Sequence, residues 1–369
     1  MKLASRRMAL RMILVMTSLG LGLLILEFGL AVWYGVAFRP GPYEVVSQWD
    51  SPFVFRVKSE PGNHNLGIRN QGPVDVEKPE GVFRILSYGD SVAGGYGIET
   101  EEMYAAVAES RLRADENQPV EILSMLRGHS PSVYLFHMRT DVPRLKPDAI
   151  VVEVELLNDV SDEARVSTSG EDAYGLPTGI ESHRYLLNWN GHIISAPFYT
   201  GTWLDRTTLF AKVTRWYGRV REKLSPNPLY HEDSDAYFYG LSGDRYRLTP
   251  EALSDGYDRL FDALSGMHDY ASQNGLRFLV LLVPSRYVFS EEAKSASSRA
   301  LLARAEESAR DRGLPFVNLT QAISQAGGSD LYQDFCHPTA GGNAAMGAEL
   351  ASAIEEWLQP RPQMRGGIH

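Results

Sequence analysis

The sequence predicts an α/β protein, a three-layer α/β/α sandwich with a parallel sheet of about five strands, preceded by one apolar amino-terminal helix. Short apolar segments alternate with longer helix-forming segments between residues 82 and 358. This alternation indicates parallel strands joined by right-handed crossovers. A distinctive residue also follows each of the first three strands, namely Ser91, Gly128 and Asn158. These residues therefore fall at the sheet edge where open α/β proteins place their chemistry.

The amino terminus predicts a membrane anchor. Residues 1–11 hold four basic residues and no acidic one, and Glu27 is the only charged residue in 12–38. A helix needs about 20 residues to cross about 30 Å of hydrocarbon. Positive charge before the span predicts a single pass with the amino terminus in the cytoplasm and the remaining domain periplasmic or extracellular. A cleaved signal peptide, with a small-residue site at 35–37, and a buried core helix are the alternatives.

Residues 39–81 are rich in proline and glycine and predict a tether that partly packs on the domain. A short strand is expected at 53–57, and residues 66–69 are a candidate contribution to the site. The α/β domain is expected to occupy 82–360, followed by a carboxyl-terminal tail at 361–369.

The first half of this domain has three expected strands. An apolar run from residue 82 stops at Gly89, and a helix follows at 101–114. The second strand is expected at 120–125, with a helix at 132–144, and the third at 149–154. Parallel pairing of these strands follows from the helices between them.

The pattern dissolves over 161–250, where aromatic residues and polar loops are frequent. This predicted insertion is either a carbohydrate-stacking surface or an aromatic-cored cap over the sheet. Regular order resumes with a helix from Pro250 to about residue 273. A strand at 277–283, a helix at 291–312, a strand at 315–319 and a helix at 339–358 complete the domain.

Composition excludes several classes of function. The net charge is −10, and the chain outside the four basic residues of 1–11 carries −14, which argues against a nucleic-acid partner. Cys336 is the one cysteine, so no intramolecular disulfide or cysteine-rich zinc site can form. The nine histidines lack metal-binding spacing, and no metal is expected.

A serine, a histidine and an acid are the groups that activated-serine chemistry requires. Ser91 ends the first strand, and Asp334 precedes His337 by three residues, just ahead of the last helix. Ser91 is therefore the candidate nucleophile, His337 the base and Asp334 the group that orients the base.

With these residues the chain resembles the SGNH hydrolase superfamily, also called the GDSL esterase/lipase family. It is similar to a membrane-anchored, bacterial-type member. The resemblance covers 82–358 and rests on four blocks in order: Gly89-Asp90-Ser91, Gly128, Leu157-Asn158-Asp159, and Asp334-Phe335-Cys336-His337-Pro338. It implies a flavodoxin-like strand order, no metal and no organic cofactor. It also implies an oxyanion hole formed by the backbone N–H of Ser91, the backbone N–H of Gly128 and the side-chain amide of Asn158.

Neighbouring residues have simpler interpretations. Asp90 is interpreted as a turn-stabilising carboxylate and Cys336 as structural filler, because adjacent side chains in an extended stretch point apart. His129 is either a pocket residue or a surface histidine.

The function expected from these residues is hydrolysis of an ester, such as an acyl or O-acetyl group on a cell-envelope glycan or lipid. Two alternatives stay open: O-acyl transfer to an extracytoplasmic polysaccharide, and a non-catalytic envelope protein that binds glycan or scaffolds a partner.

Overall fold

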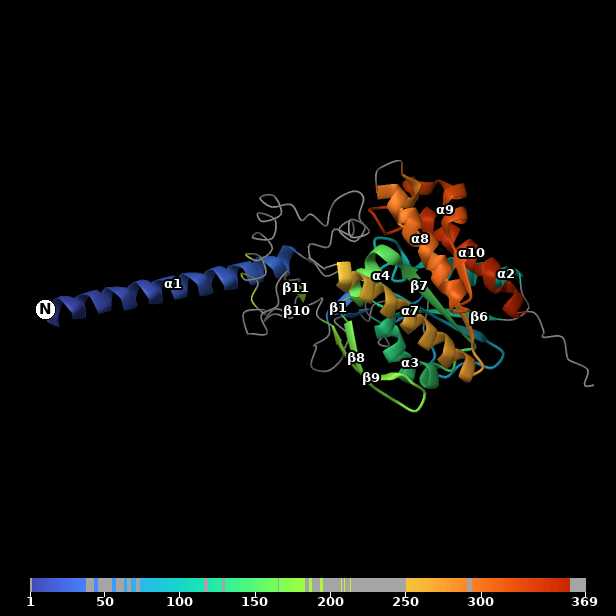
Figure 1. Cartoon of the computed structure of the whole chain (residues 1–369), viewed down its shortest axis with the longest axis horizontal. Coiled ribbons are helices and arrows are strands. Elements are labelled where there is room, and N and C mark those ends of the chain that lie inside the picture. The colour runs from blue at the N-terminus through green and yellow to red at the C-terminus, as the bar shows by residue number, and fades with distance from the viewer. Residues whose placement is uncertain are drawn as a thin grey trace, which may run out of the picture. The chain divides into compact units, whose positions relative to one another are not determined.

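The computed structural model resolves into two compact units, Met1–Val54 with His183–Asn227, and Phe55–Ser182 with Pro228–His369 (Figure 1). The structure describes residues 2–37, 43–45, 55–57, 63–64, 68–70, 74–115, 119–127, 130–164, 166–182, 186–187, 193–194, 207, 209, 213, 250–290 and 294–358.

The first unit contains the long helix α1 (Lys2–Ala37). Its segment Arg11–Leu30 has a mean hydropathy of 2.1 and is long and apolar enough to cross a membrane, a property that a signal sequence shares. Glu27, the acidic residue of this helix, accepts a hydrogen bond from the backbone N–H of Leu209 at 2.5 Å. The unit also contains β1 (Tyr43–Val45) and the antiparallel pair β10 (Leu186–Leu187) and β11 (Ile193–Ile194).

The second unit is built on a seven-stranded sheet in the order β13-β12-β7-β5-β6-β4-β3. Its five parallel strands are β5 (Phe83–Gly89), β6 (Val120–Leu126), β7 (Ala149–Glu155), β12 (Arg277–Val283) and β13 (Phe316–Asn318). Numbered along the chain, these strands have the order 2-1-3-4-5, which is the flavodoxin-like order. The predicted fold class and strand order are confirmed.

Two short antiparallel strands from the predicted tether, β3 (Asn63–His64) and β4 (Ile68–Arg69), extend the sheet beyond β6. Ile68 pairs with Met125, and its side chain is completely buried. Two-residue strands carry no periodic pattern, so the sequence did not predict them. The strand expected at 53–57 is present as β2 (Phe55–Val57).

Helices cover both faces of the sheet (Figure 1). Successive strand residues point to opposite faces. The Ser87 hydroxyl bonds to the Tyr104 hydroxyl of α2 (Tyr104–Asp115) at 2.9 Å. The next residue, Tyr88, stacks on Tyr134 of α3 (Pro131–Leu145), with ring centroids 6.2 Å apart. Helices α2 and α3 therefore lie on opposite faces, as a three-layer sandwich requires.

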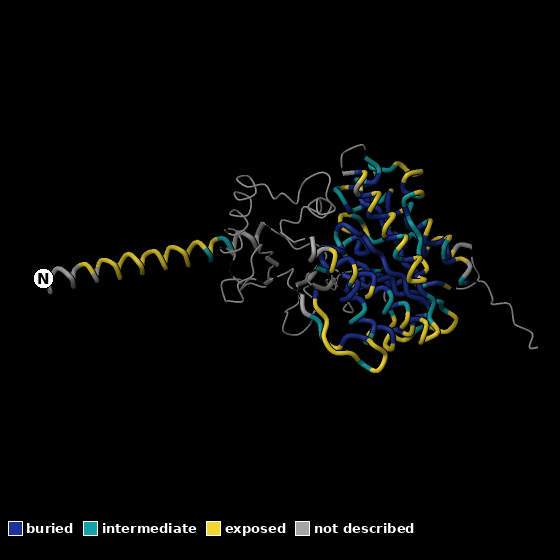
Figure 2. The backbone as a smooth tube through the Cα atoms, in the orientation of Figure 1, coloured by how far each residue is buried: buried dark blue, intermediate teal, exposed yellow. Residues whose placement is uncertain are grey.

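The two faces are completed by the later helices, and the buried residues gather along the sheet between them (Figure 2). The main apolar core joins α3 and the sheet to residues of α4 (Leu156–Glu163), α7 (Pro250–Gln273) and α8 (Lys294–Asp311). On the other face, α10 (Ala340–Leu358) packs closely on α2. Helix α9 (Thr320–Ala326) follows β13 and precedes α10 in the chain.

Most predicted boundaries agree with the structure to within three residues, and the strand at 277–283 agrees at both ends. Helix α4 was missed, because its sequence LLNDVSDE is short and acidic. The predicted insertion begins with a hairpin of β8 (Val166–Glu171) and β9 (Pro177–Ser182). Of the aromatic residues expected to line a cap or a carbohydrate surface, Tyr174 is described and exposed, and the others lie outside the described residues.

Candidate active site

Gly89 is the last residue of β5, and its lack of a side chain allows the chain to pass close to Glu153 of β7. A Cβ atom at this position would lie 2.4 Å from the Ala93 Cβ and 2.6 Å from a carboxylate oxygen of Glu153. Any side chain would therefore displace the turn that carries Ser91. The turn itself is held by main-chain hydrogen bonds from the Gly94 N–H to the Asp90 carbonyl at 2.9 Å and from the Tyr96 N–H to the Ser91 carbonyl at 3.0 Å.

Asp90 makes the turn-stabilising contact that the sequence predicts. Its Oδ1 accepts a hydrogen bond from the Val92 backbone N–H at 3.1 Å, two residues on. Its Oδ2 accepts a second bond from the Asn158 side-chain amide at 2.5 Å. Asp90 therefore joins the serine turn to the first turn of α4 (Leu156–Glu163), the helix that follows β7.

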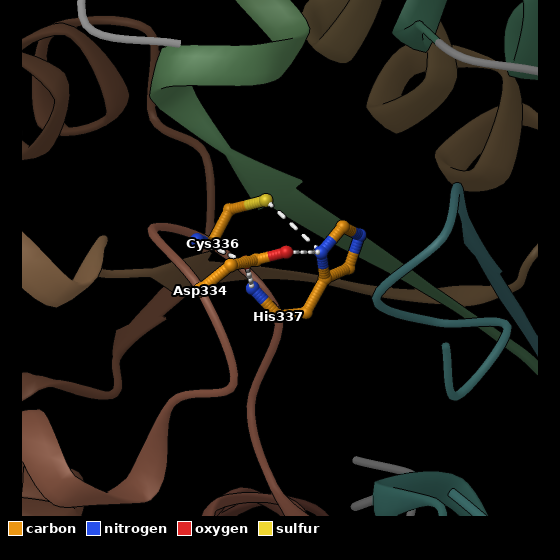
Figure 3. Close-up of side chains that lie close together, drawn as sticks. All are labelled: Asp334, Cys336 and His337. Atoms are coloured by element: carbon orange, nitrogen blue, oxygen red, sulfur yellow. Dashed lines mark hydrogen bonds and ion pairs between the residues drawn. The ribbon is translucent and has the colours of Figure 1, made fainter. Parts of the chain in front are cut away.

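His337 and Asp334 lie on the segment that precedes α10, and Figure 3 shows the Asp334 carboxylate directed at the imidazole. Asp334 Oδ2 is 2.7 Å from His337 Nδ1, and its Oδ1 accepts a bond from the His337 backbone N–H at 2.8 Å. Partial burial raises the pKa of the Asp334 carboxyl, but the hydrogen bonds from the His337 side chain and backbone outweigh it. The net pKa of Asp334 is lower than its ordinary value, and the carboxylate stays ionised.

The imidazole reaches the serine on its other side. Ser91 Oγ lies 2.8 Å from His337 Nε2, although the two residues are separated by 246 positions. The structure thus brings Ser91, His337 and Asp334 into one hydrogen-bonded line. Such a line can move a proton from the hydroxyl to Nε2 while the carboxylate holds the ring in the required tautomer.

The expectation that the Cys336 and His337 side chains point apart is wrong. Cys336 Sγ lies 3.6 Å from His337 Nδ1, so the adjacent side chains converge instead of pointing apart (Figure 3). The segment 332–339 is a tight loop in which the Asp334 carboxylate accepts bonds from the backbone N–H groups of Cys336 and His337. An extended strand is therefore the wrong geometry for this segment. Burial, and then the negative charges of Glu155 and Asp334, raise the pKa of the thiol. Cys336 remains a protonated, buried neighbour of the imidazole.

Asp334, Cys336 and His337 each offer one ligand atom, and these atoms lie within 4.8 Å of one another. A metal ion would have to displace the Asp334 bond from Nδ1 and remove a proton from a thiol whose pKa is raised. The donor set is therefore better suited to holding the imidazole than to holding a cation.

Asn158 lies in the first turn of α4. Its backbone N–H donates to Glu155 Oε2 at 2.9 Å, and Asp159 Oδ2 accepts a bond from the Glu155 backbone N–H at 2.8 Å. These reciprocal bonds fix the start of the helix. The bond to Asp90 then brings the Asn158 amide to the serine turn. Gly128 and His129, the other candidates at this edge, lie outside the described residues.

A layer of buried carboxyl groups lies beneath the serine turn, and the sequence reading missed it. Glu153, Glu155 and Asp159 are each 1% exposed. Burial is the largest cause that raises the pKa of each, and the Asp90 charge adds to it; the pKa of Glu155 reaches about 8. Two glutamates spaced by two in the otherwise apolar strand Ala149–Glu155 are the signal that would have indicated such a layer.

Tyr96 is a further residue that the sequence did not indicate. Its ring centroid lies 4.4 Å from that of His337 with an interplanar angle of 33°, and half of the residue is exposed. Its carbonyl accepts a hydrogen bond from the Gln333 side chain at 2.9 Å. The aromatic ring therefore covers one face of the imidazole at the open side of the site.

Comparison with known proteins gives distant likenesses. No protein-family model matches the chain, and no curated protein matches it. Solved structures resemble it, and among them are lipolytic proteins of the GDSL type and esterases. A lipase/acylhydrolase from Enterococcus faecalis is 13% identical, with a TM-score of 0.40, covering 76% of this chain and 99% of its own.

Two further structures are similar to the same extent. A GDSL-like lipase from Bacteroides thetaiotaomicron is 15% identical, with a TM-score of 0.36, over 74% of this chain and 88% of its own. Axe2, an acetyl-xylooligosaccharide esterase from Geobacillus, is 11% identical, with a TM-score of 0.42, over 76% of this chain and 97% of its own.

Proposed function

We propose that this protein is a serine esterase that uses Ser91 as nucleophile, His337 as general base and acid, and Asp334 as the group that orients His337. The observation that carries the proposal is the continuous hydrogen-bonded line of 2.8 Å and 2.7 Å through the imidazole. A serine hydroxyl is a weak nucleophile near neutral pH and needs such an adjacent base.

The proposed reaction has two halves. Ser91 Oγ bonds to the ester carbonyl carbon while its proton passes to His337 Nε2. The carbon–oxygen bond to the alcohol then breaks, and His337 returns the proton to the departing alkoxide. In the second half, water gives a proton to Nε2 and attacks the acyl-serine, which releases the carboxylic acid and restores the Ser91 hydroxyl.

Negative charge on the carbonyl oxygen needs fixed donors. We assign this role to the backbone N–H groups of Ser91 and Gly128 and to the Asn158 amide. The closeness of the amide to the serine turn, through its bond to Asp90, supports the assignment of Asn158. The assignment of Gly128 rests on the sequence alone. Removing one such donor typically lowers turnover about 10²–10³-fold.

The proposed substrate is an acyl ester, including an O-acetyl group, on a cell-envelope glycan or lipid. Support for this setting comes from α1, whose apolar stretch Arg11–Leu30 follows a basic amino terminus. We propose that α1 is a single-pass anchor with its amino terminus in the cytoplasm, which leaves the catalytic unit in the periplasm or outside the cell.

The test is hydrolysis of p-nitrophenyl acetate and butyrate by the full-length protein in detergent. Ser91→Ala and His337→Ala are compared with wild type, together with Ser352→Ala on α10 as a matched folded control. Activity that is lost in the first two variants and kept in the third supports the proposal. If the protein transfers the acyl group to an added oligosaccharide and releases no free acid, its function is acyl transfer and not hydrolysis. A wild-type protein that neither turns over esters nor reacts with a fluorophosphonate at Ser91 would refute the serine mechanism.

A further inference from the structure

A buried arginine, Arg69, donates hydrogen bonds to the loop that follows Ser91. Arg69 lies on β4, which precedes the catalytic strands in the sequence and pairs with β6 through Ile68↔Met125 and Arg69↔Ser124. The residue is 7% exposed. Its place is therefore set by the sheet, while its side chain extends to a different part of the chain.

The guanidinium group donates to four oxygens of the loop 94–100. Nη1 lies 2.5 Å from the Gly94 carbonyl and 2.8 Å from the Gly95 carbonyl, and Nη2 lies 2.7 Å from the Ile98 carbonyl. Nε donates to the Thr100 hydroxyl at 3.2 Å. Burial of a cation is costly unless its donors are satisfied, and here three carbonyls and one hydroxyl of the loop accept from them.

The loop is shaped to receive this side chain. Gly95 has a φ of +62°, a conformation that disfavours other residues. A Cβ atom there would lie 3.2 Å from Arg69 Nη1 and 2.5 Å from the Met103 side chain. The glycine thus permits both the turn and the close approach of the guanidinium group.

The same loop contacts the proposed base. Gly94 bonds back to Asp90 and Tyr96 bonds back to Ser91 through their main-chain N–H groups. The Tyr96 ring packs at a tilt against the His337 ring, and the Gln333 side chain, from the segment that carries His337, donates to the Tyr96 carbonyl. Arg69 on one side and Gln333 on the other therefore fix a loop that touches both Ser91 and His337.

We propose that Arg69 is a positioning residue of the active site, which holds the loop 94–100 so that Ser91 and the Tyr96-covered His337 keep their reactive geometry. This inference rests on the proposed esterase function. It means that a segment expected to act as a tether completes the catalytic unit. Among the residues that the structure describes, Arg69 donates to the loop 94–100 and not to Ser91 or His337, so it acts through the loop. A displacement of about 1 Å at a reacting centre can lower turnover about 10²-fold.

Arg84 provides a matched control. This residue is completely buried and also donates to main-chain carbonyls, those of Asp75, Val76 and Leu145, in addition to its ion pair with Glu121. It lies at the start of β5, whereas Ser91 follows the end of that strand. Loss of either arginine removes a buried cation and several hydrogen bonds, but only Arg69 bonds to the nucleophile loop.

The experiment compares Arg69→Ala with Arg84→Ala in the full-length protein. Turnover of p-nitrophenyl butyrate is expressed per Ser91 that reacts with a fluorophosphonate, and hydrogen exchange is followed in the loop 94–100. We expect Arg69→Ala to lower kcat about 10²-fold with KM for this small ester little changed, and to speed exchange in the loop. Arg84→Ala should lower the Tm while it leaves both readouts at wild-type values.

The inference is overturned if Arg69→Ala keeps wild-type turnover per reactive serine, or if exchange in the loop does not change. Failure of the proposed function has a different result. In that case the wild-type protein hydrolyses no ester, while faster loop exchange confined to Arg69→Ala would still establish that Arg69 holds the loop 94–100.

Discussion

At the scale of single residues, Asp334 is the group whose role is easiest to isolate. It contacts His337 through both carboxylate oxygens, one on the ring and one on the backbone. Asp334→Asn keeps the shape of the side chain but presents an amide to Nδ1, which favours the wrong tautomer. We expect kcat for p-nitrophenyl butyrate to fall about 10³–10⁴-fold with the fold intact. Circular dichroism of the variant is the control, and near-wild-type turnover would remove Asp334 from the mechanism.

The raised pKa of Glu155 predicts how the stability of the protein changes with pH. Burial raises the folded pKa of Glu155 to about 8, above the ordinary value of 4.5. A raised folded pKa contributes stability that is fully present below the unfolded pKa and is lost as pH rises through the folded one. The Tm should therefore fall between pH 5 and pH 9, and Glu155→Gln should flatten this decline because the amide does not ionise. Thermal scans in which the Tm of wild type and of Glu155→Gln falls equally with pH would contradict the prediction.

Cys336 lies beside the base but is not suited to act as a nucleophile, because it is buried and its pKa is raised. We expect iodoacetamide to leave the native enzyme active, and Cys336→Ser to keep turnover within about tenfold of wild type, since the smaller hydroxyl disturbs packing only locally. A thiol-reactive reagent that abolished activity in the folded wild-type protein, but not in Cys336→Ser, would show that the thiol is accessible.

At the scale of elements, close helix crossings depend on glycine. Gly347 lets α10 approach α2, because a Cβ atom there would lie 2.6 Å from the Tyr104 carbonyl and 2.7 Å from the Val107 Cβ. Gly347→Ala should lower the free energy of unfolding by about 1–3 kcal/mol, despite the higher helix propensity of alanine. Denaturant titration measures this change, with Glu349→Ala on the exposed side of α10 as control. A higher free energy of unfolding for Gly347→Ala would contradict the prediction, because it would mean that α10 and α2 can move apart without loss of stability.

The elements also show what sequence reasoning can reach. The strand Arg277–Val283 was predicted at both ends because its apolar run is buried on both faces of the sheet. The pairing of Ser91 with His337 followed from residue types and from strand ends. By contrast, α4 depends on capping by the Glu155 side chain, and the Arg69 and Tyr96 contacts depend on loop conformation. Neither leaves a periodic trace in the sequence.

At the scale of the whole molecule, α1 predicts attachment to a membrane. We expect the protein to remain in the membrane fraction after washing at high salt, and deletion of residues 1–38 to move it into the soluble fraction, because the apolar stretch Arg11–Leu30 would be lost. The intact mass of the purified protein distinguishes a retained anchor from a cleaved leader. Recovery of the full-length chain in the soluble fraction without detergent would contradict the anchor.

The distance along the chain between nucleophile and base has a consequence for biosynthesis. His337 is synthesised 246 residues after Ser91. At about 5–20 residues per second, the ribosome needs about 12–50 s to cover that interval. Throughout this time the nascent chain carries a serine with no base to activate it, while an anchor at the amino terminus would already have been inserted. Under the proposed mechanism, the order of synthesis therefore keeps the unfinished polypeptide from cleaving esters before its catalytic unit has folded.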